Sequence, residues 1–411
     1  MSMLSRRSAL QLGMSALAAL AAQNALGGAA PGARGDAPAQ SSLRPFSLSL
    51  FAKLSEAQPE ENVFLSPLSI VEAIGMLQAG ARGDTAAEIA SAIGIPQNQL
   101  PDIISSVNEI LLGKDRPYTV SLANAVWVQQ TYPLRADYQK LLEAKYAAEG
   151  ANCDFIAKPE QERQRINQWV SQKTKDKIKD LLPSSSISPL TRLVVTNAIY
   201  FNAEWERAFD PDRTKEENFT LDAGEFMVPV SLMNAQFSNL SYFEDDTLQA
   251  IDLPYRGNTA SMLVLLPRKG AASEMAKSIT PQKLAAITSG LRSASVTVWL
   301  PKFKLETSYD LIPPLKSLGM KRAFDASAAD FTGMSEGAKS EGLHVSTVVH
   351  KAYLDVNEQR TEAAGATGAA VTLSAVPTRP AVFRADHPFL FVIRDRKSGE
   401  LLFIGRYSNP S

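Results

Sequence analysis

One serine in this chain lies in a spacing typical of hydrolase nucleophiles. Gly333-Met-Ser-Glu-Gly337 satisfies the pattern G-x-S-x-G, in which a serine on a sharp turn attacks acyl groups. That chemistry requires an apolar strand before the motif and a helix after it. Here the flanking segments, 325–332 and 338–342, are rich in small and polar residues and both read as loop. We therefore interpret Ser335 as a turn residue rather than an enzyme nucleophile.

The residues that support metal, redox or polyanion chemistry are scarce. Cys153 is the single cysteine, so the chain cannot form an internal disulfide, and three histidines without a CxxC or HExxH spacing leave little for a metal site. We expect no metal and no cofactor. A net charge of -1 gives no general reason to bind nucleic acid. The lysines of 173–180 alternate with aspartates beside Trp169 and Leu181, which favours a solvated helix face over a polyanion site.

The most informative segment runs from Glu358 to Thr372. After its first turn it has no charge, no proline and almost nothing larger than valine. Every second residue from Thr361 is small and uncharged, so this face can be buried at little steric or desolvation cost. A segment that tolerates burial on both faces can become a central strand of a sheet. The alternative is a flexible Ala/Gly linker, which seldom follows an alternating strand such as that of 345–356.

This segment resembles the hinge and reactive loop of serpins, the serine protease inhibitors. Their pattern is Glu, any residue, Gly, Thr, Glu and then a run of small residues. The matching positions are Glu358, Thr361, Glu362, Ala363, Ala364, Gly365, Ala366 and Thr367. Gln359 occupies the variable position, and Arg360 departs from the pattern because the family has glycine there. We call residues 358–367 the hinge.

The resemblance extends over nearly the whole chain after residue 45, because several segments occur in the family's order. They are Asn62-Val-Phe-Leu-Ser-Pro-Leu-Ser-Ile70, 196–210, Leu300-Pro-Lys-Phe303, Leu318-Gly-Met320, Asp330-Phe331, Leu343-His-Val-Ser346 and Asp386-His-Pro-Phe-Leu-Phe391. One of these segments alone is weak evidence, whereas their ordered occurrence together is highly specific.

The fold class expected from pattern and resemblance is α+β. Helical periodicity dominates the first half, from Pro45 to about Gly94 and in 100–112, 137–145 and 160–182. Strand-like runs follow at 120–128, 192–201, 260–266, 295–305, 345–356 and 401–407. Nothing in the interior reads as a linker, so we expect one domain over 43–411. The resemblance implies helices packed around a large mixed β-sheet with smaller sheets, and an exposed reactive loop near the C-terminus.

The resemblance also assigns structural roles to two sets of residues. Ser66, Ser69, Asn197 and His350 correspond to a polar cluster beneath the middle of the large sheet, where two strands must part; we call it the shutter. Trp205, Lys302 and Glu358 correspond to the opening of that sheet, which we call the breach. We expect Lys302 and Glu358 to form a surface pair that contributes about 0–1 kcal/mol.

The mechanism that the resemblance implies is suicide inhibition of serine endopeptidases, with cysteine endopeptidases as a further class. The protease cleaves the exposed loop, the hinge inserts into the large sheet, and the trapped acyl-enzyme stalls in a covalent 1:1 complex with a monomeric inhibitor. Counting Glu358 as the first of seventeen residues places the scissile bond at Ser374–Ala375, which suits elastase-like or subtilisin-like enzymes. A shift of one gives Leu373–Ser374 and a chymotrypsin-like target.

Cleavage after Arg379 is disfavoured because Pro380 follows it. The alternative function is a non-inhibitory serpin that acts as a protease substrate or binding protein. Arg360 bears on that choice, because glycine there would keep the hinge mobile, whereas the long stem of an arginine can still carry its charge to solvent.

The N-terminal residues resemble an export signal. Arg6 and Arg7 precede an apolar run over 12–22 that is too short to span a membrane permanently. We expect a twin-arginine-like signal over 1–30, with an ordinary Sec signal as the alternative, and a disordered spacer over 31–42. The protein is then exported, to the periplasm or the medium.

Overall fold

The computed structural model describes residues 43–113, 116–221, 226–268, 271–358 and 379–410. The chain divides into Met1–Pro38 and Ala39–Ser411, and the fold reported below is that of the second unit. Residues 359–367 of the hinge, both candidate scissile bonds, the expected signal and the expected spacer lie outside the described residues.

The described part contains nine α-helices and fourteen strands. The helices are α1 (Leu43–Ala57), α2 (Pro67–Gly80), α3 (Gly83–Ile93), α4 (Leu100–Leu112), α5 (Ala136–Tyr146), α6 (Pro159–Lys173), α7 (Ala272–Ser278), α8 (Pro281–Gly290) and α9 (Ile312–Ser317). The strands are β1 (Val63–Leu65), β2 (Tyr118–Gln129), β3 (Glu149–Cys153), β4 (Leu193–Ala203), β5 (Lys215–Thr220), β6 (Met227–Glu244), β7 (Leu248–Pro254), β8 (Ala260–Pro267), β9 (Arg292–Pro301), β10 (Phe303–Asp310), β11 (Val345–Val356), β12 (Ala381–Arg384), β13 (Phe389–Asp395) and β14 (Leu401–Tyr407).

The five-stranded sheet has the order β10-β11-β4-β2-β3. β10 is antiparallel to β11, and β2 is antiparallel to β4. β2 and β3 run parallel, and so do β11 and β4, which pair from Val345 with Leu193 to Tyr353 with Tyr200. Parallel pairing brings together strands that are far apart in sequence. Glu358 lies two residues beyond the end of β11.

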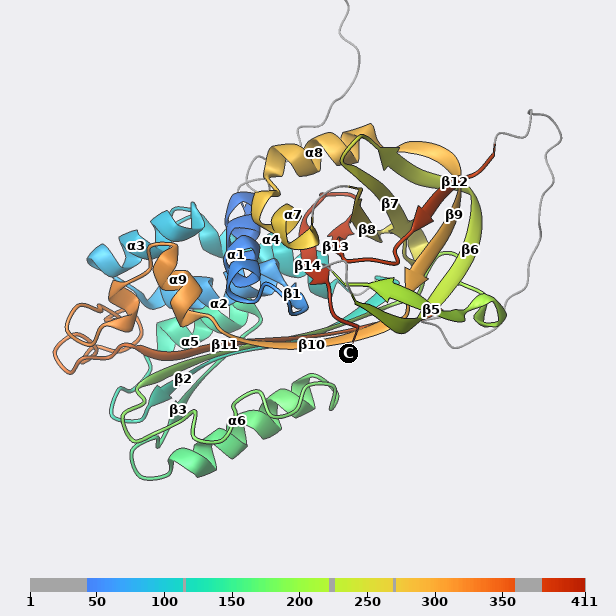
Figure 1. Cartoon of the computed structure of the whole chain (residues 1–411). Helices are drawn as coiled ribbons and strands as arrows, with labels where there is room; N and C mark the ends of the chain where they lie inside the picture. The colour runs from blue at the N-terminus through green and yellow to red at the C-terminus, as the bar shows by residue number, and fades with distance from the viewer. Residues whose placement is uncertain (1–42, 114–115, 222–225, 269–270, 359–378, 411) are drawn as a thin grey trace, which may run out of the picture. The chain divides into compact units, whose positions relative to one another are not determined.

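The two faces of this sheet bury different cores, because successive side chains of a strand point to opposite faces. In β2, Val126 and Val128 belong to the main core, whereas Trp127 belongs to a second cluster with Ile166 and Val170 of α6. α6 accordingly covers one face of the sheet, and α2 and α5 lie on the other (Figure 1). α2 is apolar and buried almost all round, which fits a helix placed between the sheet and the other helices.

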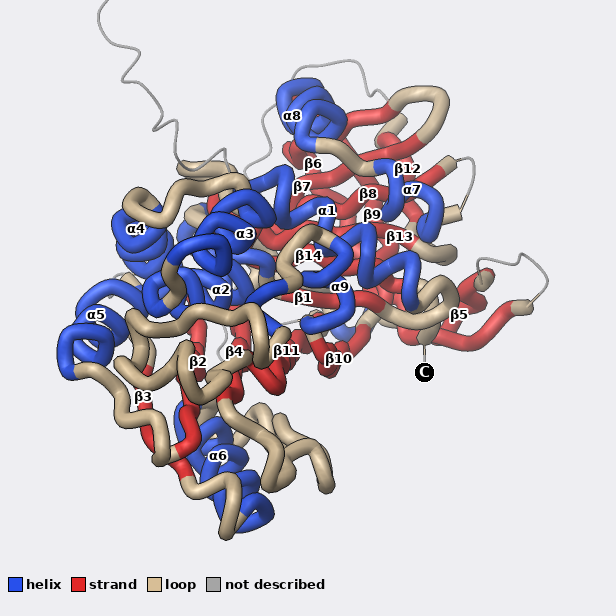
Figure 2. Tube along the Cα trace, turned by 90° about the vertical axis from the view of Figure 1, so that its left-hand side faces the viewer, coloured by secondary structure: helices blue, strands red, loops and turns tan. Residues whose placement is uncertain are grey.

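The other sheet has nine strands in the order β1-β14-β13-β8-β7-β6-β9-β12, with β5 paired to β6. β12 is a four-residue edge strand that pairs parallel with β9. α1, α7 and α8 lie near this sheet, as the view in Figure 2 shows. Among the described residues, no helix is both long and apolar enough to span a membrane.

The expected helices and strands are present, with two corrections. The helix expected over 160–182 ends at Lys173, because Lys175, Asp176 and Asp180 adopt positive φ angles of 53°, 60° and 47°, which do not continue an α-helix. Lys173 ends α6, and the exposed Lys175, Lys177 and Lys179 lie beyond the helix rather than on its face. The strand expected over 295–305 is two strands, β9 and β10, which belong to different sheets and meet at Lys302.

Candidate functional site

The structure brings the four predicted shutter residues together under the junction of β4 and β11. Ser66 precedes α2, and its hydroxyl accepts a hydrogen bond from the Ser69 amide as an N-cap. Asn197 of β4 donates through its side-chain amide to the carbonyl and hydroxyl oxygens of Ser69. His350 of β11 pairs with Asn197 across the parallel ladder. All four side chains are buried.

The contacts of His350 define a neutral imidazole. Its Nε2 lies 3.2 Å from the Ser66 amide nitrogen and accepts that hydrogen bond. Nδ1 therefore carries the proton and donates it to Oδ1 of Asn197. Burial lowers the pKa of His350 to about 3, because a second ring proton would be desolvated and would meet the Ser66 N–H.

The cluster extends further than the sequence predicted. Oδ1 of Asn124, on β2, accepts from the Asn197 amide, and Nδ2 of Asn124 donates to Oε2 of Glu72 at 2.7 Å. Glu72 lies on α2 and is fully buried, and burial raises the pKa of its carboxyl to about 8 despite that hydrogen bond. A carboxylate inside the otherwise apolar run of α2 was the sequence signal that could have revealed it.

β4 and β11 part from each other at the end that leads to Glu358. Their mutual pairing stops at Tyr200 and Tyr353. Beyond that point, 201–203 pair with β2 and 354–356 pair with β10. β4 and β11 therefore no longer pair with each other where the chain leaves β11, and we call this stretch between the two strands the gap.

The predicted breach residues lie at this gap. Trp205 stacks on Tyr255 with ring centroids 4.6 Å apart, and its indole Nε1 donates to the carbonyl of Asn357 at 2.9 Å. The Phe209 amide donates to the carbonyl of Glu358 at 2.9 Å. The backbone carbonyls of the two residues that immediately follow β11 thus accept hydrogen bonds from the segment after β4.

Glu358 is held by its side chain as well. Its carboxylate accepts from Thr214 Oγ1 at 2.9 Å and lies 3.0 Å from Nζ of Lys302. We expected a surface pair; the Lys302 side chain is 47% exposed, but that of Glu358 is only 10% exposed. Burial raises the pKa of Glu358, yet its own amide, Lys302 and Thr214 outweigh that effect, and the pKa is below its usual value.

Comparison with known proteins shows to which family the chain belongs. The model of the family "Serpin (serine protease inhibitor)" matches residues 41–410. The chain belongs to the serpin family. A leukocyte elastase inhibitor of Bos taurus is 39% identical over 373 residues, covering 89% of this chain and 97% of the relative. An uncharacterized serpin-like protein of Thermococcus kodakarensis is 38% identical over 379 residues, covering 91% and 86%.

A solved serpin structure has the same fold. The crystal structure of native protease nexin-1 with heparin superposes with a TM-score of 0.82 at 30% identity and covers 90% of this chain and 99% of that protein. The expected α+β serpin fold is therefore confirmed. Serpins bind target proteases and are mostly protease inhibitors rather than enzymes.

The structure gives no support to the esterase alternative. Ser335 lies among turns, without the flanking strand and helix that its motif requires. Its side chain is fully buried, and the hydroxyl has no hydrogen-bond partner within the described residues. No general base therefore stands beside it there.

The roles of the individual serpin site residues remain predictions. The structure places the four shutter residues and the three breach residues as described, but residues 359–367 and the bonds Ser374–Ala375 and Leu373–Ser374 lie outside its described part. Within that part, no group of three or more His, Cys, Asp or Glu side chains could hold a metal ion.

Lys302→Met should lower the stability of the native serpin by about 1 kcal/mol, because the buried Glu358 carboxylate loses its cationic partner while the exposed lysine is partly screened. Urea unfolding followed by tryptophan fluorescence measures the change. A carboxylate with a lowered pKa stabilises above its usual pKa of 4.5, so the difference should shrink as the pH falls below that value. Lys304→Met is the matched control, since that lysine is 70% exposed and lies 3.9 Å from Asp355. An equal loss in both variants would contradict the assigned pair.

Proposed function

We propose that this serpin is a suicide-substrate inhibitor of serine endopeptidases. The observation that carries the proposal is the gap between β4 and β11, which adjoins the point where the chain leaves β11 toward a run of small residues. A strand that returned from Glu358 into this gap would be antiparallel to both neighbours. It would replace one parallel ladder by two antiparallel ladders, which are somewhat more stable per residue.

The covalent chemistry is supplied by the protease. Its serine Oγ attacks the carbonyl carbon of Ser374, the bond to the Ala375 nitrogen breaks, and Ala375 leaves as a protonated amine. Ser374 remains esterified to the protease. Insertion of 359–373 then draws the ester away from the oxyanion hole, and hydrolysis of the acyl-enzyme slows.

The breach and the shutter support this course of events. The breach holds the base of the hinge by hydrogen bonds and one ion pair, which are individually weak and separable. The shutter is a compact hydrogen-bonded cluster at the point where the strands must part, and polar partners can be exchanged around an inserted strand more readily than interlocked aliphatic side chains. The native fold then depends on a kinetic barrier.

The proposed targets are elastase-like or subtilisin-like enzymes that cleave Ser374–Ala375, with a chymotrypsin-like enzyme if the bond is Leu373–Ser374. The similarity to a leukocyte elastase inhibitor supports the first class. We place the protein outside the cytoplasm, in the periplasm or the medium, because Arg6 and Arg7 precede a short apolar run. The complex is a covalent 1:1 adduct of a monomer.

The test is incubation of the mature protein with elastase-, subtilisin-, chymotrypsin- and trypsin-like proteases. We expect a complex that survives SDS and a released peptide that begins at Ala375, which mass spectrometry identifies. Arg360→Gly should lower the number of inhibitor molecules consumed per protease by about two- to threefold, since an added glycine frees the hinge backbone. Cleavage at this bond without a complex, in both proteins, would establish the non-inhibitory alternative.

A further inference from the structure

A hollow of about 370 Å³ lies where strands of the two sheets meet near the end of β14. It is lined by Asn62, by 229–231 of β6, by 302–304 at the junction of β9 and β10, by Asp355 of β11, by Tyr407 of β14 and by Pro410. Its volume is in the range of small-ligand pockets, which are mostly apolar and carry a few polar groups that orient the ligand.

The walls of the hollow are largely apolar. Phe303 and Val230 are buried, and Pro229 and Pro410 add apolar surface at the mouth. The ring of Phe303 stacks on that of Tyr407, with centroids 4.5 Å apart. The hollow therefore offers an apolar body a packed and preformed surface.

One polar group of the wall lacks a partner. Tyr407 is 3% exposed, and burial raises the pKa of its phenol. Its hydroxyl makes no hydrogen bond within the described residues, although buried hydroxyls normally have one. The neighbours of its ring are Phe303, Phe219 and Phe389, which offer no acceptor. A ligand in the hollow would supply that partner.

The charged groups around the hollow leave one cation free to donate. Lys302 is engaged with Glu358 at 3.0 Å. Asp355 accepts from the side chain of Asn357 at 3.0 Å, whereas Nζ of Lys304 lies 3.9 Å from it, too far for a hydrogen bond. The ammonium of Lys304 therefore keeps its three N–H donors for another acceptor within this part of the structure.

We propose that this hollow binds a small carboxylate with an apolar body. The carboxylate accepts hydrogen bonds from the Lys304 ammonium and the Tyr407 hydroxyl, and the body packs on Phe303 and Val230. The two donors are neighbours, because Lys304 directly follows the residue whose ring stacks on Tyr407. A dianion such as phosphate fits less well, since one free cation does not balance it and the Asp355 carboxylate repels it.

A titration followed by saturation-transfer NMR tests the site with phenylacetate as the probe. Phenylacetamide lacks the charge, and acetate lacks the apolar body. We expect one saturable site for phenylacetate with a dissociation constant on the order of 1 mM, and at least about tenfold weaker binding of the other two. Bound phenylacetate should also slow hydrogen exchange of the amides in 302–304.

Tyr407→Phe and Lys304→Met should each weaken phenylacetate binding about tenfold, because each removes one donor to the carboxylate. Tyr407→Phe keeps the aromatic packing, and urea unfolding without the probe shows whether each variant is folded. Lys339→Met is the matched control, since that lysine is also 70% exposed and pairs with an aspartate, Asp330, at 3.2 Å.

Three results would overturn the proposal. They are equal affinity in the wild type and both site variants, equal loss in Lys339→Met, and phenylacetamide that binds as tightly as phenylacetate. Absence of saturation at ten times the expected dissociation constant would overturn it as well. None of these readouts needs a protease, so they test the hollow independently of the proposed function.

Discussion

Glu72→Gln should make the native protein about 2 kcal/mol less stable at pH 5 than at pH 7, relative to the wild type, and His350→Gln should have the opposite effect. The reason is that these two buried groups respond to pH in opposite directions. A wild type that contains both should show little net change from this cluster between pH 5 and 6.5.

The signs follow from the two pKa values. His350 has a pKa of about 3 in the fold against an ordinary 6.5, so the unfolded chain binds the extra proton and stability falls as pH drops below 6.5. Glu72 has a pKa of about 8 against an ordinary 4.5, so the folded chain keeps the proton and stability falls as pH rises above 4.5. In each single variant, the pH dependence of stability that the remaining group contributes is no longer offset by the group that was removed.

Urea unfolding midpoints at pH 5, 6 and 7 measure the effect, followed by tryptophan fluorescence and always compared with the wild type. The double variant Glu72→Gln/His350→Gln should show about the same pH dependence as the wild type, because both groups are removed. His344→Gln is a control, since that histidine is half-buried outside the cluster. Parallel pH profiles in all variants would refute the assigned protonation states.

Thr367→Arg should reduce formation of the covalent protease complex by more than about a hundredfold. Thr367 belongs to the alternating set that we expect to face the buried side of the sheet, toward the shutter. An unpaired arginine there would cost several kcal/mol, and each 1.4 kcal/mol added to the insertion barrier slows it about tenfold. Deacylation is unaffected, so the protease should release the cleaved protein.

Ala366→Arg is the matched control, because the same side chain is placed one residue earlier, on the opposite face of the inserted strand. Part of that face lies away from the main core, toward α6, where the long stem can reach solvent. SDS gels and titration of residual protease activity give the yield of complex. Equal loss in both variants would mean that the face assignment is wrong, and full trapping by Thr367→Arg would mean that this part of the segment does not insert.

The sequence predicted the fold through ordered motifs rather than through periodicity. Periodicity located α4 and β11 with their observed bounds, because each has a clean apolar pattern. It failed where a strand is followed at once by another in a different sheet, as at Lys302, since the alternation continues across the junction. It also extended α6 past Lys173, because the periodic apolar residues Ile178 and Leu181 pack under the sheet from a turn.

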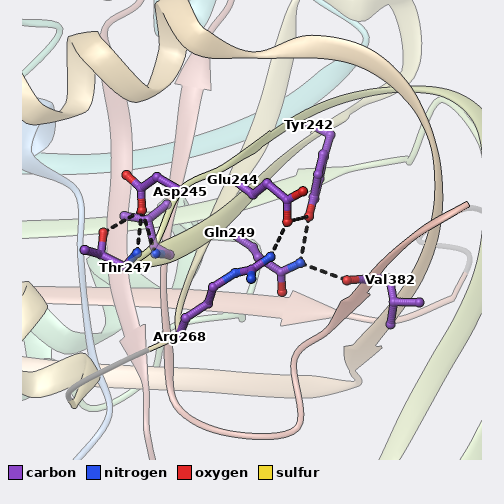
Figure 3. A network of polar contacts seen from close by, with 8 residues as sticks. Tyr242, Glu244, Asp245, Thr247, Gln249, Arg268 and Val382 are labelled. Carbon is purple, nitrogen blue, oxygen red and sulfur yellow. Dashed lines mark hydrogen bonds and ion pairs between the residues drawn. The ribbon is translucent and has the colours of Figure 1, made fainter.

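Some residues of the candidate site were predicted from the sequence and others were missed, and the difference has a physical reason. Ser66, Ser69, Asn197 and His350 were found by resemblance, and their hydrogen bonds appear only when three separate elements are brought together. Glu72 and Asn124 were missed because neither belongs to the quoted motif set, although a buried carboxylate in an apolar helix is a local anomaly. The hydrogen bond from the Gln249 side chain to the Val382 carbonyl (Figure 3) could not be predicted, since the two residues are 133 positions apart in the sequence.

The parallel contact of β4 and β11 has a consequence for how the protein behaves in concentrated solution. Under the proposed function, the gap accepts backbone and small side chains, and it would not distinguish the molecule's own segment from that of a neighbour. The protein's own segment is favoured by its tether, which corresponds to an effective concentration on the order of millimolar. Crowding, or warming that separates β4 and β11 for longer, would reduce that advantage. It would favour oligomers in which the segment of one molecule is inserted into the sheet of the next.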